Sequence, residues 1–260
     1  MPELPDLQAF SRNLTKRLAG KKVKSIVTPY KKRLKTPEAE LQRALVGRVV
    51  KEVTRQGKEL HFHFRSGDIL ALHLMLRGNL YYFEGDDHEK KYPILEMMFT
   101  DKTGLVMTDF QGQATPTLNP DEHEGIDALS DELTLAFVKA KFEKSKAAIK
   151  NLLLDQHFIR GIGNAYADEI LWHAGISPFS VTNKIPDKYI KQIVKLIPKV
   201  LRDAEKKILK SNPEIITGEV RDFLLIHNAK NTHSPTGAAI KVQLKGGRKT
   251  YFTDEQELFA

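Results

Sequence analysis

The chain has 260 residues, 41% of them hydrophobic, which is enough for a buried core in one large domain or two smaller ones and excludes a disordered chain. It contains no cysteine, which excludes disulfides and any zinc site with cysteine ligands, and no apolar run long enough to span a membrane. The net charge of +8 favours nucleic acid as a partner, although a solvated lysine-rich surface explains it equally well.

The first half of the chain begins with a helix and continues as strands. Five apolar residues recur at helical spacing near the N-terminus: Leu4, Leu7, Phe10, Leu14 and Leu18. Pro5 suits the first turn of this helix, and Gly20 ends it. From residue 23 to about 112, short alternating or apolar runs are separated by turn residues, with a short helix inserted at 37–46. This pattern predicts an antiparallel β-sandwich or barrel.

The second half is mostly helical. Residues 115–129 contain two prolines, a glycine and an acidic cluster, and we interpret them as an interdomain linker. Helical spacing follows in LTLAFVKAKFEKS, KAAIKNLLLDQ, GNAYADEILWHAG, the long run from IPDKY to ILKS, and TGEVRDFLL. The tail, AAIKVQL-KGGRK-TYFT, predicts a β-hairpin.

The expected fold class is therefore α+β with two domains. An antiparallel β-sandwich flanked by helices covers residues 1–128, and a helical domain with the terminal hairpin covers residues 129–260.

The turn RGIGN lies between two expected helices within residues 152–178. Gly161 and Gly163 permit backbone angles that other residues avoid, and Asn164 suits the N-cap of the second helix. The first amides of that helix could bind a phosphate. An ordinary corner between two packed helices explains the same residue types.

The opening residues MPELP place prolines on both sides of Glu3 and so restrict the backbone around this carboxylate. If Met1 is removed, the secondary amine of Pro2 begins the chain. An α-amine has a pKa of about 8, far below the 10.4 of lysine, so more of it is an unprotonated nucleophile at neutral pH. A plain helix start, in which Glu3 complements the helix dipole, explains the same residues.

Four motifs together resemble one family. DQ…GIGNxYADEIL…AGISP resembles the helix–two-turn–helix segment of the Fpg/Nei (formamidopyrimidine-DNA glycosylase and endonuclease VIII) DNA glycosylases. PELP resembles the N-terminus of that family, GKEL (57–60) its lysine-bearing turn, and GGRKTYF (246–252) its C-terminal hairpin, all in family order.

The resemblance implies a base-excision-repair DNA glycosylase that is also an AP lyase. Its partner would be double-stranded DNA containing damaged bases or abasic sites, with no cofactor and no membrane association. A monomer in the cytoplasm, associated with the nucleoid, is expected.

The resemblance also implies residue roles. The Pro2 amine attacks C1′ of the damaged nucleotide, Glu3 moves protons, and Lys58 contacts the phosphate beside the lesion, completing the catalytic set. The further DNA contacts implied are His73, Asn164 and Arg248. Without the resemblance, Lys58 is more typical of a solvated lysine in a turn than of a phosphate contact. His73 is likewise more typical of a packed strand residue than of a DNA contact.

The C-terminal hairpin departs from many members of the family, which hold it with four zinc-bound cysteines. Thr253 and Gln256 stand about where the second cysteine pair would be. We therefore expect the zincless type of hairpin, held by packing and without a metal.

The residues that fill the gap left by the extruded base also differ. Leu76 stands at the position of a methionine wedge, and Gln111 and Gln113 stand at the positions of an arginine and a phenylalanine. A glutamine cannot reproduce the charged bidentate contact of arginine with the unpaired base. The long loop that caps 8-oxoguanine in the family has no expected counterpart after VRDF (220–223), so we expect weak excision of that base and a shallow opposite-base preference.

Two alternatives stay open at this point. One is a damage-binding protein that kept the fold and lost catalysis. The intact set of Pro2, Glu3 and Lys58 argues against it, and the altered wedge keeps it open. The other is a structural nucleoprotein that shares only the helix–two-turn–helix, which PELP and GGRKTYF argue against.

Overall fold

A computed structural model describes residues 1–32, 34–85, 88–122 and 124–260. The chain forms two compact units, one of residues 1–122 with 208–219 and one of residues 123–207 with 220–260. Each is described by itself. The structure differs here from the sequence-based division at residue 128, because the segment 208–219 belongs with the first unit.

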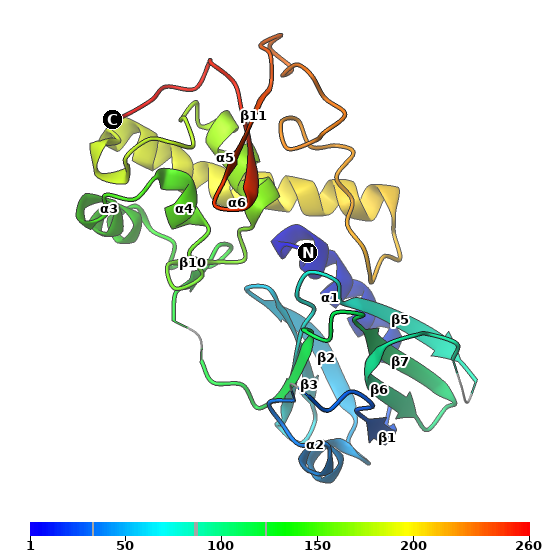
Figure 1. Cartoon of the computed structure of the whole chain (residues 1–260). Helices are drawn as coiled ribbons and strands as arrows, with labels where there is room; N and C mark the ends of the chain where they lie inside the picture. The colour runs from blue at the N-terminus through cyan, green and yellow to red at the C-terminus, as the bar shows by residue number, and fades with distance from the viewer. Residues whose placement is uncertain (33, 86–87, 123) are drawn as a thin grey trace. The chain divides into compact units, whose positions relative to one another are not determined.

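The first unit contains two four-stranded antiparallel sheets (Figure 1). The first sheet has the order β1-β6-β7-β5 and the second the order β2-β3-β4-β8. The strands are β1 (Val23–Val27), β2 (Val50–Gln56), β3 (Glu59–Phe64), β4 (Ile69–His73), β5 (Asn79–Glu84), β6 (Pro93–Phe99), β7 (Thr103–Thr108) and β8 (Thr115–Leu118). Two helices accompany them, α1 (Leu4–Leu18) and α2 (Glu38–Leu45).

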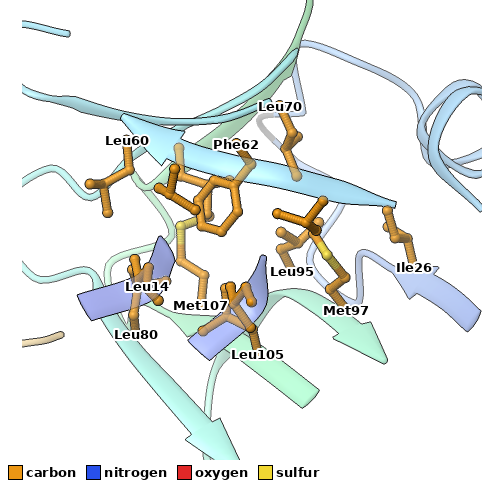
Figure 2. Close-up of a cluster of buried hydrophobic side chains, with 14 of the residues drawn as sticks. Leu14, Ile26, Leu60, Phe62, Leu70, Leu80, Leu95, Met97, Leu105 and Met107 are labelled. Carbon is orange, nitrogen blue, oxygen red and sulfur yellow. The ribbon is translucent and has the colours of Figure 1, made fainter. Parts of the chain in front are cut away.

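The core of this unit lies between the two sheets. Figure 2 shows Phe62 and Leu70 of one sheet facing Leu95, Leu105 and Met107 of the other. The apolar stripe of α1 joins this core, and all five of its expected core residues are buried. Strand alternation thus gives each sheet one apolar face, and burying the two faces together makes the sandwich.

The segment 208–219 joins the first unit through polar and apolar contacts. The Asn13 side-chain amide donates to the Ile215 carbonyl at 2.9 Å, and the Leu80 N–H donates to the Thr217 hydroxyl at 3.2 Å. Ile216 is buried in the same core. Helical periodicity reaches into this segment, so the sequence could not separate it from the helix that precedes it.

The expected linker at 115–129 contains two strands. β8 pairs with β4, and β9 (Ile126–Asp127) pairs in parallel with β10 (Ile159–Arg160). His123, also in that stretch, lies outside the described residues. The helix expected in TGEVRDFLL does not form, because Gly218 has a φ of +84° and the following residues make turns.

The second unit holds the remaining helices and the terminal hairpin (Figure 1). They are α3 (Leu135–Lys144), α4 (Ile149–Leu153), α5 (Asn164–His173), the 3-10 helix η1 (Thr182–Lys184), α6 (Asp187–Ser211, whose last turn belongs to the first unit), β11 (Lys241–Lys245) and β12 (Arg248–Phe252). Among the described residues, no helix has the length and apolar character needed to cross a membrane.

Candidate functional site

The N-terminal motif forms the start of α1. Glu3 is the N-cap and, with Asp6, makes a reciprocal capping box in which the Glu3 N–H donates to the Asp6 carboxylate at 2.9 Å. Pro2 is buried, and Glu3 is only 5% exposed. The ammonium group of Met1 pairs with the Glu219 carboxylate. The helix start and a catalytic role are therefore compatible, since the capping box holds Glu3 next to Pro2.

Lys58 follows Gly57 in the tight turn between β2 and β3, where Gly57 has a φ of +56°. The nearly buried Arg55 organises this turn. Its Nη1 atom donates to the Gly57 carbonyl at 3.1 Å, and its Nε atom donates to the Gln8 side chain on α1 at 2.9 Å. Arg55 thus connects the turn of Lys58 with the helix that begins at Glu3. No sequence signal points to this role, because an arginine in an alternating strand is typical of a solvated face.

His73 ends β4 and is half-buried. Its Nδ1 atom accepts the Met75 N–H at 3.0 Å. This bond requires an unprotonated Nδ1 and so places the ring proton of the neutral histidine on Nε2, as a donor.

The three expected wedge residues lie on two loops of the first unit. Leu76 is exposed in the turn between β4 and β5. Gln111 is exposed and Gln113 half-buried in the loop between β7 and β8, where both donate their backbone N–H to the Asp109 carboxylate. The sequence reading overlooked Phe110 in this loop, which is exposed.

The turn between α4 and α5 is held by Gln156. Its side chain accepts the Gly161 N–H at 2.9 Å and donates to the carbonyls of Leu154 and Ile162. Gly161 needs glycine, with a φ of +100°. Gly163 has a φ of −119°, which is extended backbone that other residues also adopt. Gly163 is the N-cap, and Asn164, expected there, is the first helical residue.

The hairpin turn at Gly246 and Gly247 has positive φ at both residues, which suits a two-residue hairpin and leads directly into Arg248. The Asn164 side chain donates to the Lys249 carbonyl at 2.9 Å, so the start of α5 touches the hairpin. Arg248 lines a cavity of about 510 Å³ together with Lys150, Phe179 and Gly246. The structure therefore brings Asn164 and Arg248 to neighbouring positions in the second unit.

The aspartate of the YADE motif, Asp168, holds this arrangement together. The buried Asp168 contacts the Lys150 ammonium at 2.7 Å, the Tyr251 N–H at 3.0 Å and the His227 ring at 2.7 Å. Lys150 also donates to the Thr250 hydroxyl at 2.9 Å. Because α4, α5 and β12 all meet at this one carboxylate, Asp168 sets the position of the hairpin. Sequence reasoning missed this role, since the partners are up to 83 positions away.

The hairpin base contains hydroxyl and amide groups in place of metal ligands. The Thr253 N–H donates to the Gln256 side chain at 2.8 Å, and Gln256 donates to the Ile176 carbonyl at 2.7 Å. The Glu255 carboxylate accepts hydrogen bonds from three hydroxyls: Ser234, Thr236 and Thr253. Hydroxyl and amide groups do not suit zinc, which prefers thiolate and imidazole ligands, and the one carboxylate is already hydrogen-bonded to three hydroxyls.

Comparison with known protein families identifies two consecutive domains. Residues 1–115 match the formamidopyrimidine-DNA glycosylase N-terminal domain, and residues 125–212 match the formamidopyrimidine-DNA glycosylase H2TH domain. Formamidopyrimidine-DNA glycosylases of Bacillus subtilis and Streptococcus pneumoniae are 30% and 31% identical to the chain, and each match covers 97% of both sequences.

Solved structures are similar over nearly the whole chain. A complex between Lactococcus lactis Fpg and DNA containing an abasic site is 28% identical, with a TM-score of 0.87 over 97% of this chain and 98% of that one. A complex of the same organism's Fpg with DNA containing an oxidised pyrimidine has the same identity, coverage and TM-score. Since family domains, relatives and fold agree along its length, the chain belongs to the formamidopyrimidine-DNA glycosylase family.

Proposed function

We propose that the protein is a base-excision DNA glycosylase and AP lyase that removes oxidised bases and then nicks the strand. The observation that carries the proposal is the N-terminal Pro2–Glu3 pair, held by the capping box at the start of α1 in a member of this family. Relatives bound to DNA containing an abasic site or an oxidised pyrimidine support the same substrate class.

Catalysis begins at the Pro2 amine once Met1 has been removed. Its lone pair attacks C1′, the glycosidic C–N bond breaks, and the base leaves with the bonding electrons and takes up a proton, while the Pro2 nitrogen loses its N–H proton. Glu3 donates a proton to the deoxyribose ring oxygen as the ring opens and C1′ becomes the carbon of an iminium ion. Loss of a proton from C2′ then expels the 3′ phosphate, and a second elimination expels the 5′ phosphate.

The DNA backbone is held by residues of both units. Lys58 contacts the phosphate beside the lesion, and His73 donates from Nε2 to a neighbouring phosphate. Arg248 offers a planar fork of N–H groups to a phosphate. Asn164 uses one side-chain N–H for Lys249 and has a second for a phosphate near the start of α5. The protein acts as a monomer on double-stranded DNA.

Borohydride trapping on duplex DNA with an abasic site tests the proposal. Borohydride reduces the iminium ion to a stable amine, so protein with an unblocked Pro2 becomes covalently attached to DNA. Mass spectrometry of the protein confirms removal of Met1 before the assay. If correctly processed protein binds abasic DNA but is not trapped, the alternative of a non-catalytic damaged-DNA-binding protein replaces this proposal.

A further inference from the structure

The long helix α6, yellow in Figure 1, carries a row of positive charges along one side. The charged residues recur three or four positions apart, which is the spacing that keeps side chains on one face of a helix. All of them are exposed and lie in the second unit, and at a rise of about 1.5 Å per residue they span about 27 Å. We call this set the α6 stripe: Lys188, Lys191, Lys195, Lys199, Arg202 and Lys206.

The α6 stripe lies opposite the side of the helix that is buried in the second unit. The buried residues repeat with the same spacing but are offset by about two positions, which is half a turn of a helix. They are Ile190, Ile193, Ile197, Leu201 and Ala204. Docking of this helix on a membrane or on an apolar protein surface would need exposed apolar side chains, but the apolar face is already covered.

The charges of the α6 stripe are mostly not neutralised within the protein. Among the described residues, Lys206 is the one member with an ion pair, to the Asp203 carboxylate at 3.6 Å. Like charges four positions apart repel each other and weaken a helix. The stripe has three such pairs: Lys191 with Lys195, Lys195 with Lys199, and Arg202 with Lys206. A face that is only solvated gains nothing from this arrangement, whereas bound phosphates would neutralise the charges and remove the repulsion.

The α6 stripe is separate from the residues proposed to hold the substrate. Helix α5 packs against one flank of α6, with a cavity of about 280 Å³ between the two helices. Asn164 begins α5, and the strand that begins with Arg248 docks on α5 through Asp168. Of the stripe, all of which the structure describes, only Lys199 lines this cavity. The stripe is thus a surface distinct from Asn164 and Arg248.

We propose that the α6 stripe is a second DNA-binding surface, which holds the phosphate backbone of a DNA segment other than the one that contains the damaged base. Lysine and arginine bind phosphates without reading the sequence and without apolar anchors, which matches the composition of the stripe. Duplex DNA presents phosphates at short, regular intervals, so a row of cations can neutralise several of them together. The stripe would keep the protein on DNA as it moves between segments.

The test uses the full-length protein already bound to one DNA. Protein is mixed in equal amounts with an unlabelled duplex that contains a tetrahydrofuran abasic analogue, at a concentration above the Kd of that complex. A fluorescent undamaged duplex is then added, and its anisotropy at several salt concentrations measures binding of the second DNA. Sedimentation shows whether both duplexes are in one complex. No step depends on the chemistry of Pro2, so this inference is tested independently of the proposed function.

Three variants accompany the wild type. Glutamine removes the charge but keeps a similar helix propensity, so the stripe variant combines Lys191→Gln, Lys195→Gln, Lys199→Gln and Arg202→Gln. The charge-keeping variant combines Lys191→Arg, Lys195→Arg and Lys199→Arg. The matched control removes four charges from exposed lysines of the first unit: Lys22→Gln, Lys24→Gln, Lys91→Gln and Lys102→Gln.

We expect the wild type to bind the second duplex with an affinity that falls about 10³-fold between about 50 and 200 mM salt, as for six phosphate contacts. The stripe variant should reduce the slope of log Kd against log salt concentration by about one unit per charge removed. The charge-keeping variant and the matched control should behave as wild type. Because like-charge repulsion is removed, the thermal unfolding midpoint of the stripe variant should not fall, which separates lost binding from a folding defect.

A wild-type complex that contains only one duplex would overturn the proposal. Equal losses in the stripe variant and the matched control would also overturn it, because net charge alone would then explain the second binding event. If the stripe binds polyglutamate or anionic vesicles but no second duplex, its partner is another polyanion and the assignment to DNA is wrong.

Discussion

At the scale of single residues, the proposed reaction depends on whether the free terminal amine belongs to Met1 or to Pro2. Met1 carries the terminal ammonium group and pairs it with Glu219, while Pro2 is buried behind it. In this form the nitrogen of Pro2 is an amide nitrogen, whose lone pair is delocalised into the peptide bond and is not nucleophilic. Removal of Met1 is therefore a chemical requirement of the mechanism.

Retained Met1 or Pro2→Gly should abolish or strongly reduce base excision while DNA binding stays largely intact. Glu3→Gln should slow base release by about 100-fold or more, the usual contribution of a positioned general acid, with some lyase activity on abasic DNA surviving. Single-turnover assays on a damaged base and on an abasic site separate the two steps. Full activity of protein whose Met1 is shown by mass spectrometry to be present would rule out the Pro2 mechanism.

The side chains proposed to contact phosphates differ in charge, so the salt dependence of DNA binding can distinguish their contributions. Lys58→Ala, Asn164→Ala and Arg248→Ala should each weaken binding to lesion DNA. Loss of the Lys58 or Arg248 charge should also reduce the slope of log Kd against log salt concentration by about one unit, whereas Asn164→Ala leaves the slope unchanged. Fluorescence anisotropy at several salt concentrations measures both quantities. Lys102→Ala, in the turn between β6 and β7, is the matched control, and an equal change of slope in it would contradict the assignment.

At the scale of elements, the hairpin of β11 and β12 depends on two carboxylates. Asp168 is buried and anchors β12 to α4 and α5, while Glu255 gathers the hydroxyls of Ser234, Thr236 and Thr253 at the hairpin base. Because Arg248 begins β12, its position depends on these contacts. A hydrogen-bonded carboxylate is a weaker cross-link than a tetrahedral metal site. Acid protonates the carboxylate and so weakens the hydrogen bonds that it accepts, whereas the hydrogen bonds of a neutral group do not depend on pH in this way.

The Glu255 cluster should make hairpin docking sensitive to acid. The Thr236 hydrogen bond, with smaller contributions from Thr253, Ser234 and the Trp172 indole, lowers the pKa of Glu255 below its ordinary value of 4.5. A carboxylate with a lowered pKa stabilises the fold above its ordinary pKa, and this contribution is lost as the pH falls through the lowered value. Trp172 is the only tryptophan of the chain, so its fluorescence reports the change directly.

We expect the emission of Trp172 to shift below about pH 4.5 in the wild type and to lose this step in Glu255→Gln. Asp254→Asn is the matched control, because Asp254 is a neighbouring exposed carboxylate that pairs instead with Lys241 at 2.7 Å. An identical acid transition in the wild type and in Glu255→Gln would show that the cluster does not hold the hairpin.

Metal removal should have no effect on this element. The hairpin base presents hydroxyls, an amide and one carboxylate, so dialysis against EDTA is expected to leave the thermal unfolding midpoint and the trapping rate unchanged. Activity lost in EDTA and restored by zinc would contradict this expectation.

At the scale of the whole molecule, substrate choice depends on what surrounds the extruded base. Residues 220–231 form a short connection whose backbone is tied down, since the Glu169 carboxylate accepts the N–H groups of Leu225, Ile226 and His227 at 2.7–3.0 Å. Asn231 donates to the carbonyls of Leu224 and Leu225, which closes the connection. We infer that so short a segment does not cover a flipped base.

We therefore expect weak excision of 8-oxoguanine opposite cytosine, with further-oxidised or ring-opened bases and abasic sites as better substrates, because poorly stacked bases are easier to extrude. A panel of lesions under single-turnover conditions, each opposite the same base, measures this. Rapid removal of 8-oxoguanine from this panel would show that a capping loop is not needed here.

The sequence by itself determined most of the elements and the family. The apolar stripe of α1 and the alternating strands were correctly predicted, because periodicity reflects local geometry and burial. PELP and GIGNxYADE likewise predicted the family, since each depends on a short contiguous stretch with a specific backbone. The roles proposed for Pro2, Glu3 and the phosphate contacts stay predictions.

Only the tertiary structure decided which distant residues meet. The strand β8 inside the expected linker, the packing of residues 208–219 on the first unit, and the contacts of Asp168 with Lys150 and Tyr251 all join positions far apart in the chain. Such contacts arise from packing between elements, which leaves no period or motif in either segment, and so no inspection of one stretch of sequence reveals them.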